Sequence, residues 1–388
     1  MRPFIEQHQL QIQAMLTALD HSLIKYSHYY FHYGSDLAKY DFDTMAAETT
    51  GNIVIFHHDH FDDENNQLMY NKIKANLQKL ANKRIIVVTS LLNLTFDLDH
   101  VKTIHCGGDL MLGEQQFKQL SPQRTKNFNN PTHWVSLTRV ARSHRILTLI
   151  YMLGKELTSY GHIRCSAMYL HTLRECSRWT DVLTLINYAD NSDFCTKNNM
   201  IMCQGYSMLK NQYHIDTQDD PVNKFYKNTT LPFKNNTNSS RNFDCYLKKY
   251  YENSVGEIVN ETLFFQPQSL LTEKFLNSVY GFNLPIILSG AGTVEHLRNI
   301  GFDLFDDVID HAYDLVPDPL LRIQTAIDSN QRLFMDPEFA RQCWKDNVAR
   351  LEQNFTFAQT KMYDVYRARC LSEFNAVFPQ HFNPIPNQ

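Results

Sequence analysis

A strand–helix–strand pattern between residues 257 and 288 constrains the fold of this chain more than any other feature. The apolar run at 257–265 predicts one strand, and Leu284–Leu288 predicts a second. Between them Thr272 is a good N-cap, apolar residues recur at helical spacing, and Gly281 can end the helix. Two strands joined in this way pair in parallel through a right-handed crossover. The pattern therefore predicts an α/β unit.

The first turn of that helix carries Glu273 and Lys274. In a parallel crossover the helix start lies at the carboxyl edge of the sheet, where open α/β folds bind ligands. There the free N–H groups and the helix dipole favour an anion, Lys274 adds positive charge, and Glu273 can accept hydrogen bonds from hydroxyls. Glu261 on the preceding strand and the backbone at Gly292 belong to the same edge. These groups predict a site for a sugar attached to a diphosphate, although an ordinary helix start and a simple tight turn also fit.

Short apolar runs alternate with helix-compatible stretches in the first half of the chain as well. They predict strands at 52–56, 84–89, 101–106 and 133–137. Because 388 residues are many for one hydrophobic core, we predict two Rossmann-like α/β domains that face each other across a cleft. The expected divisions are an N-terminal α/β domain at 1–190, a polar junction at 191–245, a C-terminal α/β domain at 246–333, and a helical region at 334–388 that packs back on the first domain.

Arginine and histidine side chains follow the expected strand at 133–137. Arg142 and Arg145, with Arg139 and His144, lie at the start of the next helix. Guanidinium groups match phosphate oxygens in two-point contacts, and a helix start adds N–H donors beside them. The cluster predicts a diphosphate contact, and a solvated helix start is the alternative.

A segment rich in His and Asp, His57–Glu64, directly follows the first expected strand. Asp59 is the carboxylate nearest to the strand end, and Asp62 is the next candidate. Either can act as a general base that takes a proton from an acceptor hydroxyl. The same residue types also suit a transition-metal site, and the segment equally fits a solvated acidic loop.

Charge and cysteine usage narrow the class of protein. The formal net charge is −4 and no long block of Lys or Arg occurs, which argues against a protein dedicated to coating nucleic acid. Eight cysteines are scattered without a CxxC pair, and the chain begins with no apolar signal segment. No apolar run is long enough to cross a bilayer. We expect free thiols, a cytoplasmic location and no membrane partner.

Four segments of the chain resemble a group of glycosyltransferase-like proteins encoded by bacteriophages and other large DNA viruses. The helix start at 272–274 is also similar to the donor site of bacterial fucosyltransferases of the GT-B fold. The segments that carry the viral resemblance best are 271–275, 285–288, 301–305 and 309–314.

The resemblance implies a GT-B fold with the donor site in the second domain. Glu and Lys of the fucosyltransferase motif contact the sugar nucleotide, and these positions fall on Glu273 and Lys274. The upstream Arg that contacts the phosphates corresponds to Arg142 or Arg145. The resemblance carries little of residues 1–130, so the base comes from the His57–Glu64 segment instead: we expect Asp59 or a neighbour to deprotonate the acceptor in a single displacement with inversion. Since no DxD motif ends a strand in the donor half, basic side chains would replace a cation, and we expect no metal site and no cofactor beyond the nucleotide sugar.

Three functions compete at this stage. The first is transfer of a sugar to a glycan or a small hydroxyl acceptor. The second is glycosylation of hydroxymethylated bases in viral DNA, which demands a basic groove and access to a flipped base. The third is a non-catalytic protein that binds a sugar or a nucleotide. Turnover separates the third from the others, and salt-sensitive DNA binding separates the second from the first.

Overall fold

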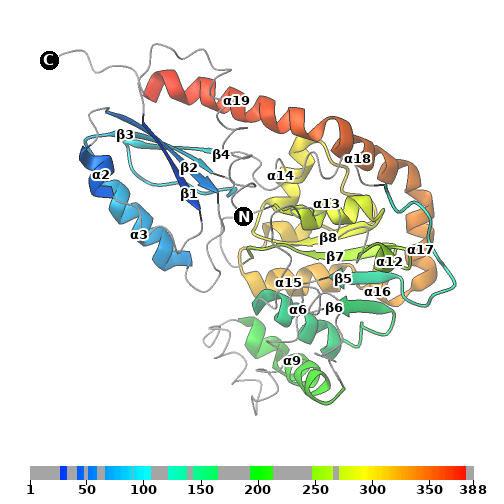
Figure 1. The fold of residues 1–388 in the computed structure, drawn as a ribbon. Helices are drawn as coiled ribbons and strands as arrows, with labels where there is room; N and C mark the ends of the chain where they lie inside the picture. The colour runs from blue at the N-terminus through cyan, green and yellow to red at the C-terminus, as the bar shows by residue number, and fades with distance from the viewer. Residues whose placement is uncertain are drawn as a thin grey trace, which may run out of the picture.

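A computed structural model describes residues 27–32, 42–47, 51–58, 66–89, 91–105, 121–137, 143–164, 193–212, 247–264 and 271–381. In this part of the chain two four-stranded sheets, each with all its strands parallel, are accompanied by helices (Figure 1). The predicted α/β class with two Rossmann-like units is thereby confirmed.

The first sheet has the strand order β1-β2-β3-β4. Its apolar residues alternate between the two faces, as the period of two in a strand requires. Ile53, Ile55, Ile85 and Val87 share one cluster with residues of the two helices on that face. The strands are β1 (Ser27–His32), β2 (Asn52–His58), β3 (Arg84–Thr89) and β4 (Val101–His105), and the helices are α2 (Phe42–Ala47) and α3 (Asn66–Gln78).

The second sheet has the strand order β6-β5-β7-β8. Helix α6 (Ser143–Gly154) connects β5 to β6, and α13 (Glu273–Tyr280) connects β7 to β8. β5 pairs with β6 and with β7, so the strands at 134–137 and 161–164 belong to this sheet, whereas the predicted division assigned them to the first domain. Strand pairing thus puts the boundary between the sheets after β4. The strands are β5 (Trp134–Leu137), β6 (Gly161–Arg164), β7 (Gly256–Asn260) and β8 (Leu284–Leu288).

Helices dominate the chain after β8. Asp318 and Asp336 accept hydrogen bonds from N–H groups of the helices they precede, and each is followed by the proline that suits a first helical position. The short helix α12 (Lys248–Tyr251) precedes β7. The later elements are α14 (Thr293–Ile300), η3 (Ala312–Leu315), α15 (Pro319–Ser329), α16 (Gln331–Met335), α17 (Pro337–Asp346), α18 (Val348–Thr360) and α19 (Met362–His381).

A twenty-residue helix, α9 (Asp193–Gln212), occupies part of the segment that the sequence suggested as a polar junction. It buries Met202, Tyr206 and Leu209 in the core of the second sheet. Gly205 lies so close to the backbone of α6 that a Cβ there would collide with the Ile150 carbonyl. Although α9 is polar in composition, it has a narrow apolar stripe, and this stripe packs against the single helix α6.

Each of the two hydrophobic cores includes a residue that follows a strand of the other sheet. Leu263, which follows β7, belongs to the hydrophobic cluster of the first sheet, and Leu92, which follows β3, belongs to that of the second. Helix α19 extends from the second unit to β4 (Figure 1), where the Glu373 carboxylate accepts the His105 N–H at 3.1 Å. No helix in the described residues is long and apolar enough to span a membrane.

Candidate functional site

The strand order of the second sheet creates a topological switch point between β5 and β7. The connection after β5 leads to β6 on one side, and the connection after β7 leads to β8 on the other. Open parallel sheets bind ligands outside the carboxyl ends of the strands at such a point. His144 and Arg145 follow β5 there, and Glu261, Glu273 and Lys274 follow β7.

Thr272 organises the start of α13. Its backbone is extended, and its hydroxyl accepts the Lys274 N–H at 3.4 Å, as the sequence predicted for an N-cap. The same hydroxyl donates to Glu261 Oε2 at 2.6 Å, and the Thr272 N–H donates to Glu261 Oε1 at 3.3 Å. The helix start is thereby fixed to the end of β7.

The Lys274 ammonium lies between two threonine hydroxyls. Nζ is 2.8 Å from Thr272 Oγ1 and 3.2 Å from Thr262 Oγ1. It is 4.0 Å from Glu261 Oε2 and 3.5 Å from Glu273 Oε1. The Lys274 side chain is 20% exposed and that of Glu273 is 43% exposed, whereas Glu261 is fully buried. A ligand can therefore reach Lys274 and Glu273 from solvent, while the buried Glu261 carboxylate lies beneath Lys274.

Burial and charge act in opposite directions on the two carboxyl groups. Burial raises the pKa of Glu261 above its ordinary value, and the nearby Lys274 charge and the Thr272 hydrogen bonds offset only part of that effect. Burial also acts on Glu273, but the charges of Lys274 and Arg145 outweigh it and hold the pKa of Glu273 below its ordinary value. The Glu273 side chain is thus kept in its anionic form.

Arg145 and His144 point inward to the backbone at the end of β7. Arg145 is 4% exposed, and its Nη2 donates to the carbonyl oxygens of Asn260 at 3.2 Å and Glu261 at 3.0 Å. His144 Nε2 donates to the same Glu261 oxygen at 3.0 Å. Arg145 therefore positions the backbone of the site and contributes its charge from beneath, rather than offering an exposed two-point fork to phosphate.

Arg322 on α15 has a similar role, and sequence reasoning missed it. It is 3% exposed, and its Nη1 donates to the carbonyl oxygens of Ser289 at 2.7 Å and Phe264 at 3.2 Å. It thereby ties together the loops that leave β7 and β8. The only sequence signal was an arginine on the apolar face of a helix, beside Leu320 and Ile323.

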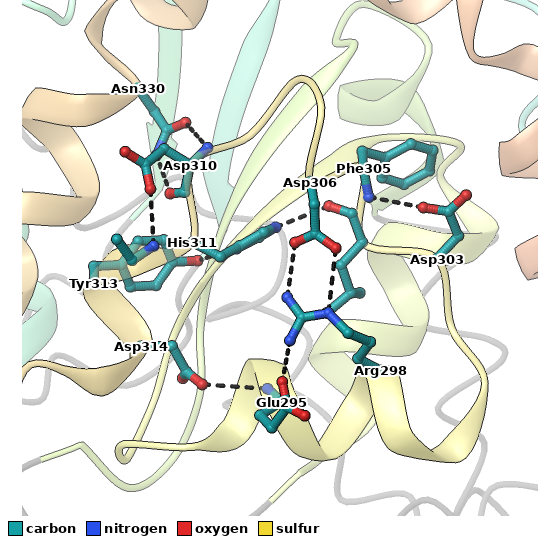
Figure 2. Close-up of polar contacts among 12 residues, drawn as sticks. Glu295, Arg298, Asp303, Phe305, Asp306, Asp310, His311, Tyr313, Asp314 and Asn330 are labelled. Carbon is teal, nitrogen blue, oxygen red and sulfur yellow. Dashed lines mark hydrogen bonds and ion pairs between the residues drawn. The ribbon is translucent and has the colours of Figure 1, made fainter.

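The start of α14, at the same sheet edge, is closed by protein groups. Gly292 has a φ of +80°, and its N–H donates to the Asp314 carbonyl oxygen at 3.0 Å. The Asp314 carboxylate accepts the Glu295 N–H at 3.2 Å (Figure 2). The Gly292 N–H, a predicted donor to ligand, is therefore already used within the chain.

The segment that leads into η3, the short helix that carries Asp314, is held by a polar network (Figure 2). Arg298 lies between the carboxylates of Glu295 and Asp306. Tyr313 Oη accepts the Ile287 N–H at 2.9 Å and lies 3.1 Å from Nδ1 of His311, whose Nε2 donates to the Leu304 carbonyl at 2.8 Å. A pocket of about 490 Å³ beside this segment is lined by acids already engaged in such contacts, including Glu295, Asp306 and Asp314.

Three predicted site residues, Asp59, Asp62 and Arg142, lie outside the described residues. The residue nearest in sequence to the two acids, among those whose side chains are described, is His57, next to the last residue of β2. It is 5% exposed, and its Nδ1 lies 3.0 Å from Thr89 Oγ1. Among the described residues, no group of three or more His, Cys, Asp or Glu side chains is placed to hold a metal ion.

Comparison with known proteins gives no match to a family model, to a curated protein or to a solved structure.

Proposed function

We propose that this chain is a nucleotide-sugar-dependent glycosyltransferase that transfers a sugar to a hydroxyl group of a glycan or a small molecule. The observation that carries the proposal is the Lys274 ammonium at the topological switch point. It is accessible to solvent, held by Thr262 and Thr272, and adjacent to the accessible carboxylate of Glu273. A cation and a hydroxyl acceptor side by side at a helix start suit a diphosphate with a sugar attached.

In this mechanism Lys274 faces the diphosphate as it leaves. Negative charge grows on that group in the transition state, so a cation already in place stabilises the transition state more than the ground state. Glu273 accepts hydrogen bonds from sugar or ribose hydroxyls. Arg145 keeps the carbonyls of β7 in position and adds long-range positive charge. A base from the first unit, Asp59 or Asp62, removes the acceptor proton in a single inverting displacement.

The test is a thermal-shift panel of UDP, GDP, ADP, CMP and dTDP sugars against three proteins. Wild type is compared with Lys274→Ala and with Lys361→Ala, which removes an exposed lysine that directly follows α18, far along the chain. We expect one nucleotide to raise the Tm of wild type and Lys361→Ala but not of Lys274→Ala. At a ligand concentration one hundred times Kd the added stability is about 2.7 kcal/mol.

A second variant separates ligand loss from misfolding. Lys274→Ala leaves the buried Glu261 carboxylate with less compensating charge, so Lys274→Ala/Glu261→Gln removes both charges together. No shift with any nucleotide would contradict the donor-site assignment. A shift without release of nucleoside diphosphate across a panel of glycans and small hydroxyl acceptors would favour a binding protein over a transferase.

A further inference from the structure

A second pocket, of about 420 Å³, opens at the amino edge of the second sheet. Its place follows from β5 and β7, which both begin near it at Trp134 and Gly256. A strand of five residues such as β7 is about 16 Å long, so this pocket and Lys274 lie at opposite edges of the sheet. The lining residues are Asn130, Thr132, His162, Lys249, Tyr250 and Asn253.

In each of the two asparagines of the pocket, only one of the two polar atoms of the side-chain amide is hydrogen-bonded to the described part of the chain. Asn130 Oδ1 accepts the Thr132 N–H at 2.9 Å, and the Asn130 carbonyl accepts Arg341 Nη2 at 2.8 Å. Asn253 Nδ2 donates to the Lys249 carbonyl at 3.0 Å. Within the described residues, the Asn130 amide N–H groups, the Thr132 hydroxyl and Asn253 Oδ1 make no further hydrogen bond. The pocket thus presents preorganised donors and an acceptor, which lowers the entropy cost of binding.

The charge of the pocket favours an anion. Lys249 lines it, no carboxylate lines it, and no ion pair of Lys249 forms within the described part of the chain. The ring of Tyr250 is already engaged, since the His162 ring stacks on it at 4.5 Å and Lys249 Nζ lies 4.9 Å from its centre. That ring is therefore a wall for an apolar surface rather than a free platform for a nucleobase.

We propose that this pocket binds a small phosphorylated sugar. Lys249 contacts the phosphate, the two asparagine amides and Thr132 take the sugar hydroxyls, and the Tyr250 and His162 rings face its C–H groups. The volume of about 420 Å³ suits one sugar ring with its phosphate. The site is separate from Lys274, so it does not depend on the proposed transferase activity.

The experiment titrates the full chain with glucose 6-phosphate by calorimetry. The proteins are wild type, Lys249→Gln, Lys248→Gln and Lys274→Ala. Lys248 is the matched control, because it precedes Lys249 on α12 and does not line the pocket. We expect saturable binding by wild type that weakens at least about tenfold in Lys249→Gln and changes less than about twofold in Lys248→Gln and Lys274→Ala.

Two further probes, glucose and inorganic phosphate, show which groups matter. Weaker binding of each of them than of glucose 6-phosphate would support a site that uses both the charge and the hydroxyls. Three results would overturn the proposal: no saturable binding by wild type up to about 10 mM, equal weakening by the substitutions at 248 and 249, and loss of binding in Lys274→Ala, which would assign the ligand to the other edge.

Discussion

Helices α13 and α14 start at the same edge of the same sheet, yet their N-termini are occupied differently. At α13 a neutral hydroxyl, that of Thr272, caps the helix, and the Lys274 ammonium remains accessible beside it. At α14 the buried Asp314 accepts the N–H groups of Gly292 and Glu295, and Arg298 is paired with Glu295 and Asp306.

This difference in capping groups indicates which of the two helix starts can take an anionic ligand. A carboxylate from the chain itself already stands where a phosphate would bind at α14. At the start of α13 the Glu261 carboxylate accepts the N–H of the cap residue Thr272, whereas the Lys274 N–H within the helix bonds to a neutral hydroxyl and the Lys274 ammonium lies beside it. Equivalent positions in a repeated strand–helix unit therefore need not have equivalent functions.

The largest difference between the N-termini of α13 and α14 is expected in kcat. Lys274→Met should lower kcat by about 10² to 10³, because a preorganised group that stabilises transition-state charge is lost. Arg298→Met should change kcat by less than about twofold, since Arg298 forms close ion pairs with Glu295 and with Asp306 at 2.7 Å, whereas Lys274 lies 3.5 Å and 4.0 Å from its two acids. Steady-state kinetics with the donor identified by thermal shift would measure both, and equal losses would contradict the comparison.

A rise in pH should lower the free energy of unfolding of the unit that contains α13, through the carboxyl group of Glu257 on β7. Burial raises the pKa of this carboxyl to about 8 from an ordinary 4.5, despite the hydrogen bond from Tyr251 and the charge of Lys126. Its contribution to stability is fully present below about pH 4.5 and is lost as pH rises through about 8. In urea unfolding, the free energy of unfolding of wild type should decrease by a few kcal/mol over that pH range, and that of Glu257→Gln should decrease less.

The control for this pH series is Glu252→Gln, which changes an exposed acid near the same strand. Its unfolding free energy should follow that of wild type at every pH. A pH profile of Glu257→Gln that matches wild type would show that Glu257 is not the group responsible.

Removing the carboxylate that closes α14 should cost stability. Asp314→Ala takes away the acceptor for the Glu295 N–H in a buried position and should lower the free energy of unfolding by about 2 kcal/mol. Asp314→Asn keeps an acceptor oxygen and should lose less. Chemical denaturation measures both, and no loss in Asp314→Ala would show that water serves the N–H groups equally well.

Acid pH should weaken the α14 side through His296. Burial, with the charges of Arg369 and His105, lowers the pKa of His296 to about 4. The stability that depends on neutral His296 is therefore present above its ordinary pKa of 6.5 and is lost as pH falls through about 4. Because His296 is half-buried, we expect this loss to be roughly 1 to 2 kcal/mol of unfolding free energy. As pH falls from 6.5 to 4, the unfolding free energy of His296→Phe should therefore decrease less than that of wild type.

The smallest effect is expected at the cap of α13. Thr272→Val removes the hydroxyl shared by Glu261 and Lys274 and should cost about 1 kcal/mol of stability, whereas Thr272→Ser keeps it and should be close to neutral. If Thr272→Val also weakens donor binding while Thr272→Ser does not, the hydroxyl positions Lys274. Equal behaviour of the two variants would argue against that role.

Local features of the site followed from the sequence. Thr272 caps α13 as expected, Gly281 follows its last residue, and β8 spans Leu284–Leu288. The predicted strand at 257–265 ends earlier, at Asn260, because the next carbonyls bond to buried side chains instead of a neighbouring strand. Those side chains, Arg145 and Arg322, come from helices far away in the sequence, so no local pattern could have shown it.

The α/β class and the short elements of the second sheet could be predicted from the chain alone, because periodicity, caps and glycines act within a few residues. The strand order that sets the switch point, the inward direction of Arg145 and the closure of α14 by Asp314 depend on the folded arrangement. A hydrogen-bonding group is free or occupied according to the partners that the fold brings to it. At α14 that partner is Asp314, 19 residues after Glu295.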